Sequence, residues 1–154
     1  MLETSLDNLR IIKAEYGHMR QLAEVMRDED KKECQLLGMT PYKSLWRSFN
    51  SSFICKSVFV GDDIAAMYGV SGIMLGEKAK PWLLTGHIVD KYPFTFARVF
   101  RKEIEKLLHM FQVLENYVDA NNTKSVRMIE LIGFKLDEPE PMGKGMFRRM
   151  EMRA

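Results

Sequence analysis

The sequence predicts a single α/β domain over residues 1–154, built on one mixed, mostly antiparallel sheet with helices on both faces. A length of 154 residues suits one domain rather than two. β-prone runs alternate with segments whose apolar residues recur every three or four positions. A strand, a long helix and another strand follow one another over residues 81–119, and this order requires a parallel strand pair joined by a right-handed crossover.

The composition is that of an ordinary globular protein, with 46% hydrophobic and 29% charged residues. It excludes a disordered chain, a collagen-like chain and a disulfide-scaffolded miniprotein. The net charge of +2 is too small to indicate nucleic-acid binding, so none is expected. No apolar stretch approaches the ~20 residues that a membrane span requires, and the first residues lack the pattern of a secretion signal. We expect a cytoplasmic protein with no membrane span.

The first third of the chain predicts one strand followed by helices. A β-prone run over residues 9–13 predicts the first strand, and apolar spacing over residues 16–37 predicts helix. We interpret the charged run 27–33 as a solvated helix face or as a break between two helices. Gly38 is a stop signal, and Thr40 followed by proline predicts the cap and first turn of the next helix.

The middle of the chain predicts strands. Residues 53–60 and 64–70 read as a hairpin around the turn 61–63. We expect a loop or short extension over residues 71–80. A further strand is expected over residues 81–86, with a proline tolerated at its start.

The last third carries the strongest helical signal, an apolar stripe over residues 94–111. A strand is expected over residues 113–119, and Asn122 is expected to cap a helix that ends at Gly133. Two final strands are expected on either side of a turn-rich segment: 134–136 and 147–152.

The cysteines and histidines show no metal-binding pattern. Cys34 and Cys55 lack the spacing of a zinc motif, and the three histidines lie far apart. We therefore expect two reduced thiols and no metal.

The segment 122–134 carries a resemblance to a known family. Asn122, Ser125 three residues later, and Gly133-Phe134 at the end match the C-terminal motif of GNAT-type N-acyltransferases. The predicted order of elements also resembles the GNAT fold over the whole chain. In that family two parallel central strands splay apart and the pantetheine arm of acetyl-CoA lies between them. The resemblance implies a GNAT-like fold with a splayed parallel pair, namely the strand ending at Thr85 and the strand 113–119, and acetyl-CoA as cofactor.

A narrower resemblance covers roughly residues 9–152. The run 114–127 with the later Ile-Gly-Phe, and residues 81–84 followed by 92–96, are similar to small GNAT-like proteins of short-tailed bacteriophages, some named internal virion protein A. This resemblance implies a phage-encoded protein located in the host cytoplasm or the virion. It implies a protein partner or an amine substrate, and leaves the oligomeric state open.

Two positions depart from an active member of the family. GNAT enzymes hold the diphosphate with a Gln/Arg-x-x-Gly-x-Gly/Ala loop, whereas the segment 85–93 here has one glycine, an acidic Asp90 and Pro93. Ile129 stands where many members place the tyrosine that protonates the leaving thiolate.

The resemblance implies a set of site residues. The candidates for cofactor binding are Leu83, Leu84, Thr85, Gly86, Lys91, Asn122 and Ser125. The candidates for catalysis are His87, Asn116 and Tyr117. His87 is either a base for an ammonium group or a surface histidine. Asn116 and Tyr117 point to opposite faces of their strand, so one can line a cleft while the other packs in the core.

Two functions remain open from the sequence. The first is transfer of an acetyl group from acetyl-CoA to an amine of a protein or small molecule, with the carbonyl oxygen held by a main-chain N–H near Leu84 or Thr85. The second is a catalytically inactive GNAT-like protein that acts by binding in virion assembly, genome ejection or host takeover.

Overall fold

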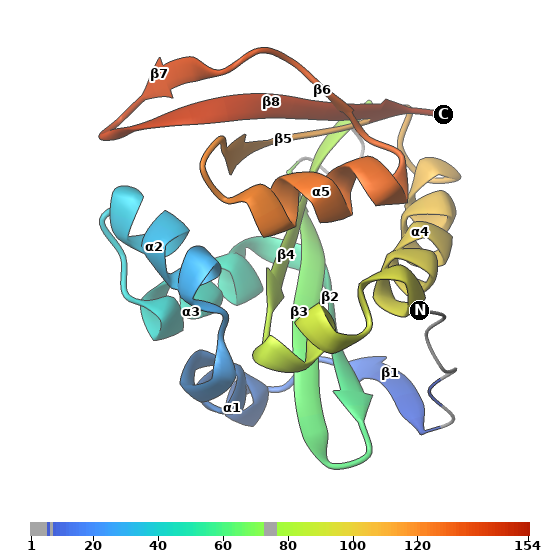
Figure 1. Cartoon of the computed structure of the whole chain (residues 1–154). Helices are drawn as coiled ribbons and strands as arrows, with labels where there is room; N and C mark the ends of the chain where they lie inside the picture. The colour runs from blue at the N-terminus through green and yellow to red at the C-terminus, as the bar shows by residue number, and fades with distance from the viewer. Residues whose placement is uncertain (1–5, 7, 73–76) are drawn as a thin grey trace.

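The computed structural model describes Leu6, residues 8–72 and residues 77–154; residues 73–76 of the expected loop 71–80 lie outside the described part. Within that part, eight strands form one sheet in the order β1-β2-β3-β4-β5-β8-β6, and β7 pairs with β8 (Figure 1). The strands are β1 (Leu9–Lys13), β2 (Ser52–Val60), β3 (Asp63–Gly72), β4 (Lys78–Thr85), β5 (Val113–Asp119), β6 (Lys135–Leu136), β7 (Glu140–Met142) and β8 (Gly145–Arg153). All neighbouring strands are antiparallel except β4 and β5, which are parallel.

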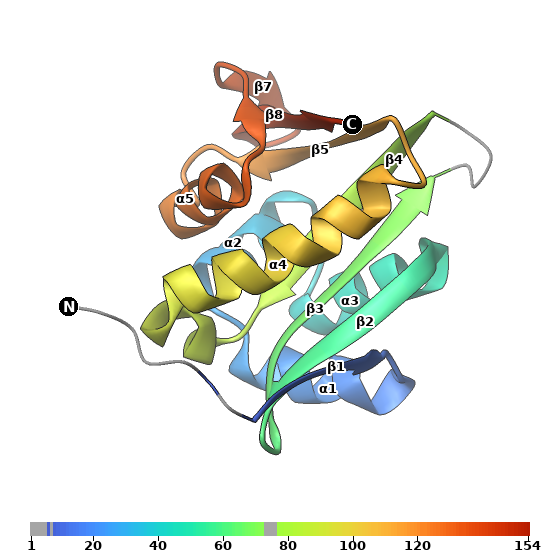
Figure 2. The same ribbon diagram turned by 90° about the vertical axis from the view of Figure 1, so that its right-hand side faces the viewer.

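Helices cover both faces of the sheet, as predicted. They are α1 (Tyr16–Val25), α2 (Asp28–Leu36), α3 (Pro41–Ser51), α4 (Pro93–Leu108) and α5 (Thr123–Ile132), with a 3₁₀ helix η1 (His87–Lys91) before α4. Figure 2 shows α4 crossing one face, while α1 and α3 lie behind the sheet. One buried apolar cluster joins the sheet to α4 and α5, and a second joins it to α1, α2 and α3. Among the described residues, no helix combines the length and apolarity needed to cross a membrane.

Local signals in the sequence explain several element ends. The Thr40 hydroxyl accepts a hydrogen bond from the Lys43 N–H at 3.2 Å and Pro41 opens α3, as the cap predicted. The Asn122 side chain caps α5 by accepting from the Ser125 N–H at 3.2 Å. Gly133 ends α5 with a φ of 117°, a conformation that favours glycine.

The structure decides between the two interpretations of the charged run 27–33 and corrects two other expectations. The helical segment 16–37 is broken into α1 and α2, as the second interpretation predicted, because the Arg27 N–H donates to the Thr85 carbonyl at 3.0 Å instead of continuing α1. The segment after β4 forms η1 rather than an irregular loop, and the turn-rich segment near the C-terminus contains the short strand β7.

The parallel pair separates soon after it begins. β4 and β5 pair at Lys78–Val113 and Ala79–Leu114 only. Beyond that point the Asn116 side-chain amide spans the space and donates to the Pro81 carbonyl at 2.7 Å. Pro81 sits in an interior strand without losing a ladder bond, because its nitrogen faces this gap. The splayed parallel pair is therefore confirmed, and it creates an opening within the sheet.

Candidate functional site

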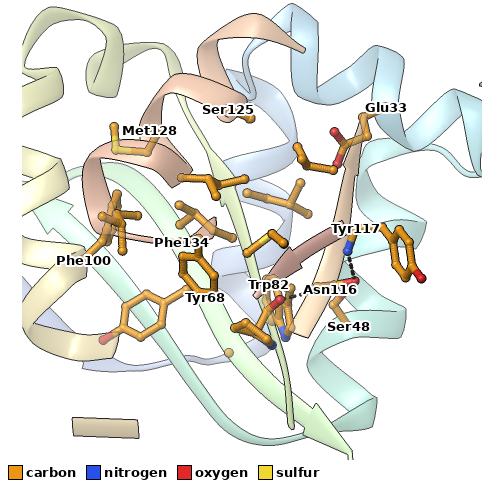
Figure 3. A pocket seen from close by; sticks show the side chains of 18 of the residues that line it. Glu33, Ser48, Tyr68, Trp82, Phe100, Asn116, Tyr117, Ser125, Met128 and Phe134 are labelled. Atoms are coloured by element: carbon orange, nitrogen blue, oxygen red, sulfur yellow. Dashed lines mark hydrogen bonds between the residues drawn. The ribbon is translucent and has the colours of Figure 1, made fainter. Parts of the chain in front are cut away.

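A cavity of about 230 Å³ occupies the gap between β4 and β5 (Figure 3). It is lined from both faces of the sheet. On the α4–α5 side its walls are mostly apolar: Leu83, Phe100, Leu107, Met128, Ile132 and Phe134. The polar exceptions on this side include Glu103 and the Tyr68 hydroxyl that donates to it. On the α2–α3 side polar groups join the wall: Glu33, Ser44, Ser48, Trp82 and Tyr117. The cavity thus reaches both faces of the sheet rather than lying on one, and we refer to it as the passage.

The strand ladder decides which main-chain groups of β4 face this passage. The Gly86 N–H donates to the Ala65 carbonyl of β3 at 2.8 Å. Because main-chain groups alternate along a strand, Leu84 also bonds to β3, whereas Leu83 and Thr85 direct their N–H and C=O groups into the gap. We expected the N–H of Leu84 or Thr85 to hold a carbonyl oxygen, but of these two only the Thr85 N–H faces the gap. The Leu83 N–H faces the gap as well.

At the C-terminal end of β4, the gap between β4 and β5 is filled by the buried carboxylate of Asp30 from α2. One oxygen of Asp30 accepts from the Thr85 N–H at 3.0 Å and from the Thr85 hydroxyl at 2.7 Å. The other accepts from the Asn122 side chain at 3.0 Å and the Ser125 hydroxyl at 3.1 Å. Asp30 is only 3% exposed, so this carboxylate ties the end of β4 to the start of α5.

Arg27 balances the charge of this carboxylate. Its guanidinium lies 3.2 Å from Asp30, donates to the Ser125 hydroxyl at 2.9 Å and reaches Asp90 at 3.1 Å. Burial opposes ionisation of Asp90, but hydrogen bonds from Lys124 and Arg27 outweigh it and lower the pKa of Asp90. Among the described residues, the buried Nε of Arg27 has no hydrogen-bond partner.

Glu33 lies one turn further along α2 and lines the cavity (Figure 3). Its carboxylate accepts from the Asp119 N–H at 2.9 Å and, more weakly, from the Asn122 side chain at 3.4 Å. Burial and then the negative charges of Asp30 and Asp119 raise the pKa of Glu33 to about 7. Within the part of the chain that the structure describes, no cation pairs with it.

The structure brings most of the expected site residues together. Leu83, Leu84, Asn116, Tyr117 and Ser125 line the cavity, with Tyr117 at 37% exposure. The other two expected residues at this gap, Thr85 and Asn122, are held in the network around Asp30.

Three of the expected residues lie away from the cavity. His87 and Lys91 are exposed at the two ends of η1, and neither lines the cavity. Gly86 is buried in a bridge with Met26, where an added Cβ would lie 3.2 Å from a methyl group of Val25.

The charged run 27–33 holds the residues that sequence reasoning missed. The interpretation as a solvated face is wrong for Arg27 and Asp30, each 3% exposed, while the interpretation as a helix break is confirmed. The signal was available, because Arg27, Asp30 and Glu33 are spaced by three and lie on one helix face.

Comparison with known proteins identifies the fold. No protein-family model and no curated protein sequence matches the chain. Several solved structures match the chain. The ribosomal L7/L12 α-N-protein acetyltransferase RimL in complex with coenzyme A matches with a TM-score of 0.68 at 10% identity, over 96% of this chain and 94% of that one. The spermidine N-acetyltransferase of Vibrio cholerae with CoA and spermine matches with a TM-score of 0.69 at 12% identity, over 95% of each chain.

The chain has the GNAT fold. A third GNAT-fold neighbour, the microcin C7 self-immunity acetyltransferase MccE in complex with acetyl-CoA and AMP, matches with a TM-score of 0.67 at 10% identity, over 96% of this chain and 93% of that one. These identities establish the architecture. The splayed β4–β5 pair, α4 and the Asn122-capped α5 are parts of the GNAT fold that line the cavity, together with α2 and α3.

Coenzyme A fits one part of this gap and not the other. Beside Leu83 the cavity borders a gap-facing amide and mostly apolar walls, which suit an acyl thioester. At the end of β4, Asp30 and Asp90 place two carboxylates near the segment 85–93, where the family holds the diphosphate. The Thr85 amide is already bonded there, and Pro93 has no N–H to donate. In the described conformation, this end does not fit a diphosphate.

Proposed function

We propose that the chain is a GNAT-type N-acyltransferase that moves an acetyl group from acetyl-CoA to an amine of a protein or small molecule. The observation that carries this proposal is the passage at the β4–β5 gap, which is lined mostly by apolar side chains on the α4–α5 face and by more polar groups on the α2–α3 face. Such a passage lets two reactants meet from opposite faces, which supplies the proximity that acyl transfer requires. The acetyltransferase neighbours add support at the level of the fold.

The chain's own residues suit the polar steps of such a transfer. The N–H of Leu83 faces the gap beside the cavity and is the donor we assign to the carbonyl oxygen. Glu33 is the group we assign as proton acceptor for the amine, because a carboxyl with a pKa of about 7 exchanges a proton at neutral pH. Asn116 holds the edges of the gap through Pro81, and Tyr117 lies at its mouth.

A second function, non-catalytic binding, is favoured by a different observation. Arg27 and Asp30 occupy the end of the gap that a GNAT enzyme opens to its cofactor. A GNAT-fold protein of a phage with this end permanently closed would act by binding, in virion assembly, genome ejection or takeover of the host. Fold alone does not decide between the two functions.

Binding of acetyl-CoA tests the first function directly. Thermal unfolding of the protein is followed during titration with acetyl-CoA, with dephospho-CoA as the matched control for the terminal phosphate. A ligand at 100 times its dissociation constant adds ~2.7 kcal/mol to the free energy of unfolding, several degrees for a chain of this size. A saturable shift followed by acetylation of supplied amines supports the enzyme. No shift at millimolar acetyl-CoA contradicts it and leaves the binding function.

A further inference from the structure

We propose that the α2–α3 half of the passage binds a primary monoamine with an apolar body, whose ammonium group pairs with Glu33. This inference deepens the proposed function and rests on it, because it names the class of acceptor that the transfer would use. Two features of this half carry it. One is an open carboxylate oxygen, and the other is the apolar character of the remaining wall.

Glu33 presents one oxygen that is free to bind a ligand. The Asp119 N–H and the Asn122 side chain both donate to Oε1, at 2.9 and 3.4 Å. Oε2 has no hydrogen-bond partner among the described residues. Figure 3 shows the Glu33 carboxylate directed towards the cavity that it lines. Such an oxygen gains most from a charged donor, because hydrogen bonds between ionised partners are the strong ones.

The charges around Glu33 favour a cationic ligand. The negative charges of Asp30 and Asp119 act on the Glu33 carboxyl and help to raise its pKa. Among the described residues that line this half, Arg27 is the only cation, and it already pairs with Asp30 and Asp90 at 3.2 and 3.1 Å. An ammonium group beside Glu33 would therefore enter a surplus of negative charge, whereas a carboxylate there would be repelled.

The remaining wall of this half limits the ligand to a single charge. It includes Leu37, Met39 and Trp82, with Tyr117 at the mouth. Within the described lining on this side, Glu33 supplies the sole carboxylate, so a second ammonium group would lose its water without gaining a partner. A polyamine is disfavoured for this reason. An amino acid is disfavoured because its own carboxylate would find no free cation.

Trp82 gives this half a fixed apolar surface. Its indole N–H donates to the Ser52 hydroxyl at 2.7 Å, and that hydroxyl donates to the Ser48 carbonyl at 2.6 Å. The indole also lies against Gly69, where an added Cβ would be 2.8 Å from the indole nitrogen. A glycine at this strand position permits the close approach. The ring is thus held beside the cavity, where the apolar body of an amine can pack against it.

NMR titration with 2-phenylethylamine, in the absence of acetyl-CoA, tests the site. At pH 8 Glu33 is mostly ionised, because its pKa is about 7. We expect a saturable shift of the Trp82 indole N–H signal and none for Trp46, which is exposed and does not line the cavity. The uncharged analogue 2-phenylethanol should bind about tenfold more weakly, because it lacks the charge-assisted hydrogen bond to Glu33. Spermidine should also bind more weakly than 2-phenylethylamine.

Two pairs of variants assign the contacts. Glu33→Gln should bind the amine and the alcohol equally, whereas the exposed Glu24→Gln should behave like the native chain. Leu37→Glu adds a second carboxylate to this half, so it should bind spermidine about tenfold more tightly than the matched variant Leu37→Gln.

The outcomes separate this inference from the proposed function. Tighter binding of spermidine than of 2-phenylethylamine by the native chain would overturn the monoamine class and leave the acyltransferase standing. No binding of 2-phenylethylamine at millimolar concentration, a shift at Trp46 alone, or an amine affinity unchanged in Glu33→Gln would overturn the site itself. Binding of the amine without binding of acetyl-CoA would contradict the acyltransferase and leave the amine site standing. If Glu33→Gln does not fold, 2-phenylethanol and the two Leu37 variants decide.

Discussion

At the scale of single residues, Glu33 couples the stability of the fold to pH. Its pKa is about 7 in the folded protein and 4.5 as the ordinary value, so the folded state binds the proton more tightly. The free energy of unfolding should therefore fall as pH rises from about 4.5 to 7, by roughly 2–3 kcal/mol. Denaturant titrations at pH 5 and pH 8 should show this fall in the native chain and a smaller one in Glu33→Gln. The exposed Glu24→Gln is the control, and equal pH profiles for all three would refute the assignment.

The main-chain amides of the neighbouring residues Leu83 and Leu84 point to opposite edges of β4. The Leu84 N–H belongs to the β3–β4 ladder, whereas that of Leu83 faces the gap. Leu84→Pro should cost roughly 1–3 kcal/mol of unfolding free energy, because it removes a ladder bond and leaves the facing carbonyl of β3 without its donor. Leu83→Pro should cost much less, because the nitrogen of Leu83 faces the gap as that of the natural Pro81 does. The same substitution should abolish acetyl transfer. Thermal unfolding and a transfer assay on the pair check this contrast, and equal destabilisation would argue against the splayed geometry.

At the scale of elements, the end of α5 depends on backbone conformation rather than on space. Gly133 has a φ of 117°, and an added Cβ would lie 3.4 Å from the end of the Met152 side chain, ordinary contact distance. Gly133→Ala should therefore cost ~1–2 kcal/mol through strain alone. Gly17→Ala in α1 meets nothing within 4 Å and should be neutral or gain up to ~1 kcal/mol. Urea titrations of both variants give the comparison, and a stable Gly133→Ala would mean that α5 ends differently.

At the scale of the whole molecule, what the sequence predicted well is what depends on near neighbours. The strand 113–119 and the cap at Asn122 follow from alternation and a short capping contact, and both match the structure. The burial of Asp30 depends on partners 55 to 95 positions away, such as Thr85 and Ser125. A run of charges is normally solvated. The spacing by three puts part of this run on one helix face, but the partners of that face are known only from the convergence of β4 and α5 on α2.

The two faces of the sheet should carry separate functions, because the passage joins two differently lined halves. Ser48→Phe narrows the α2–α3 half, and Met128→Trp narrows the α4–α5 half. We assign the acyl donor to the apolar half. Ser48→Phe should then retain the thermal shift with acetyl-CoA while losing transfer to the amine, and Met128→Trp should lose the shift itself. Each substitution overpacks a partly open site at a cost of roughly 1–3 kcal/mol, so both proteins are compared with their own unliganded state. Loss of the shift in both variants would mean that donor and acceptor do not enter from opposite faces.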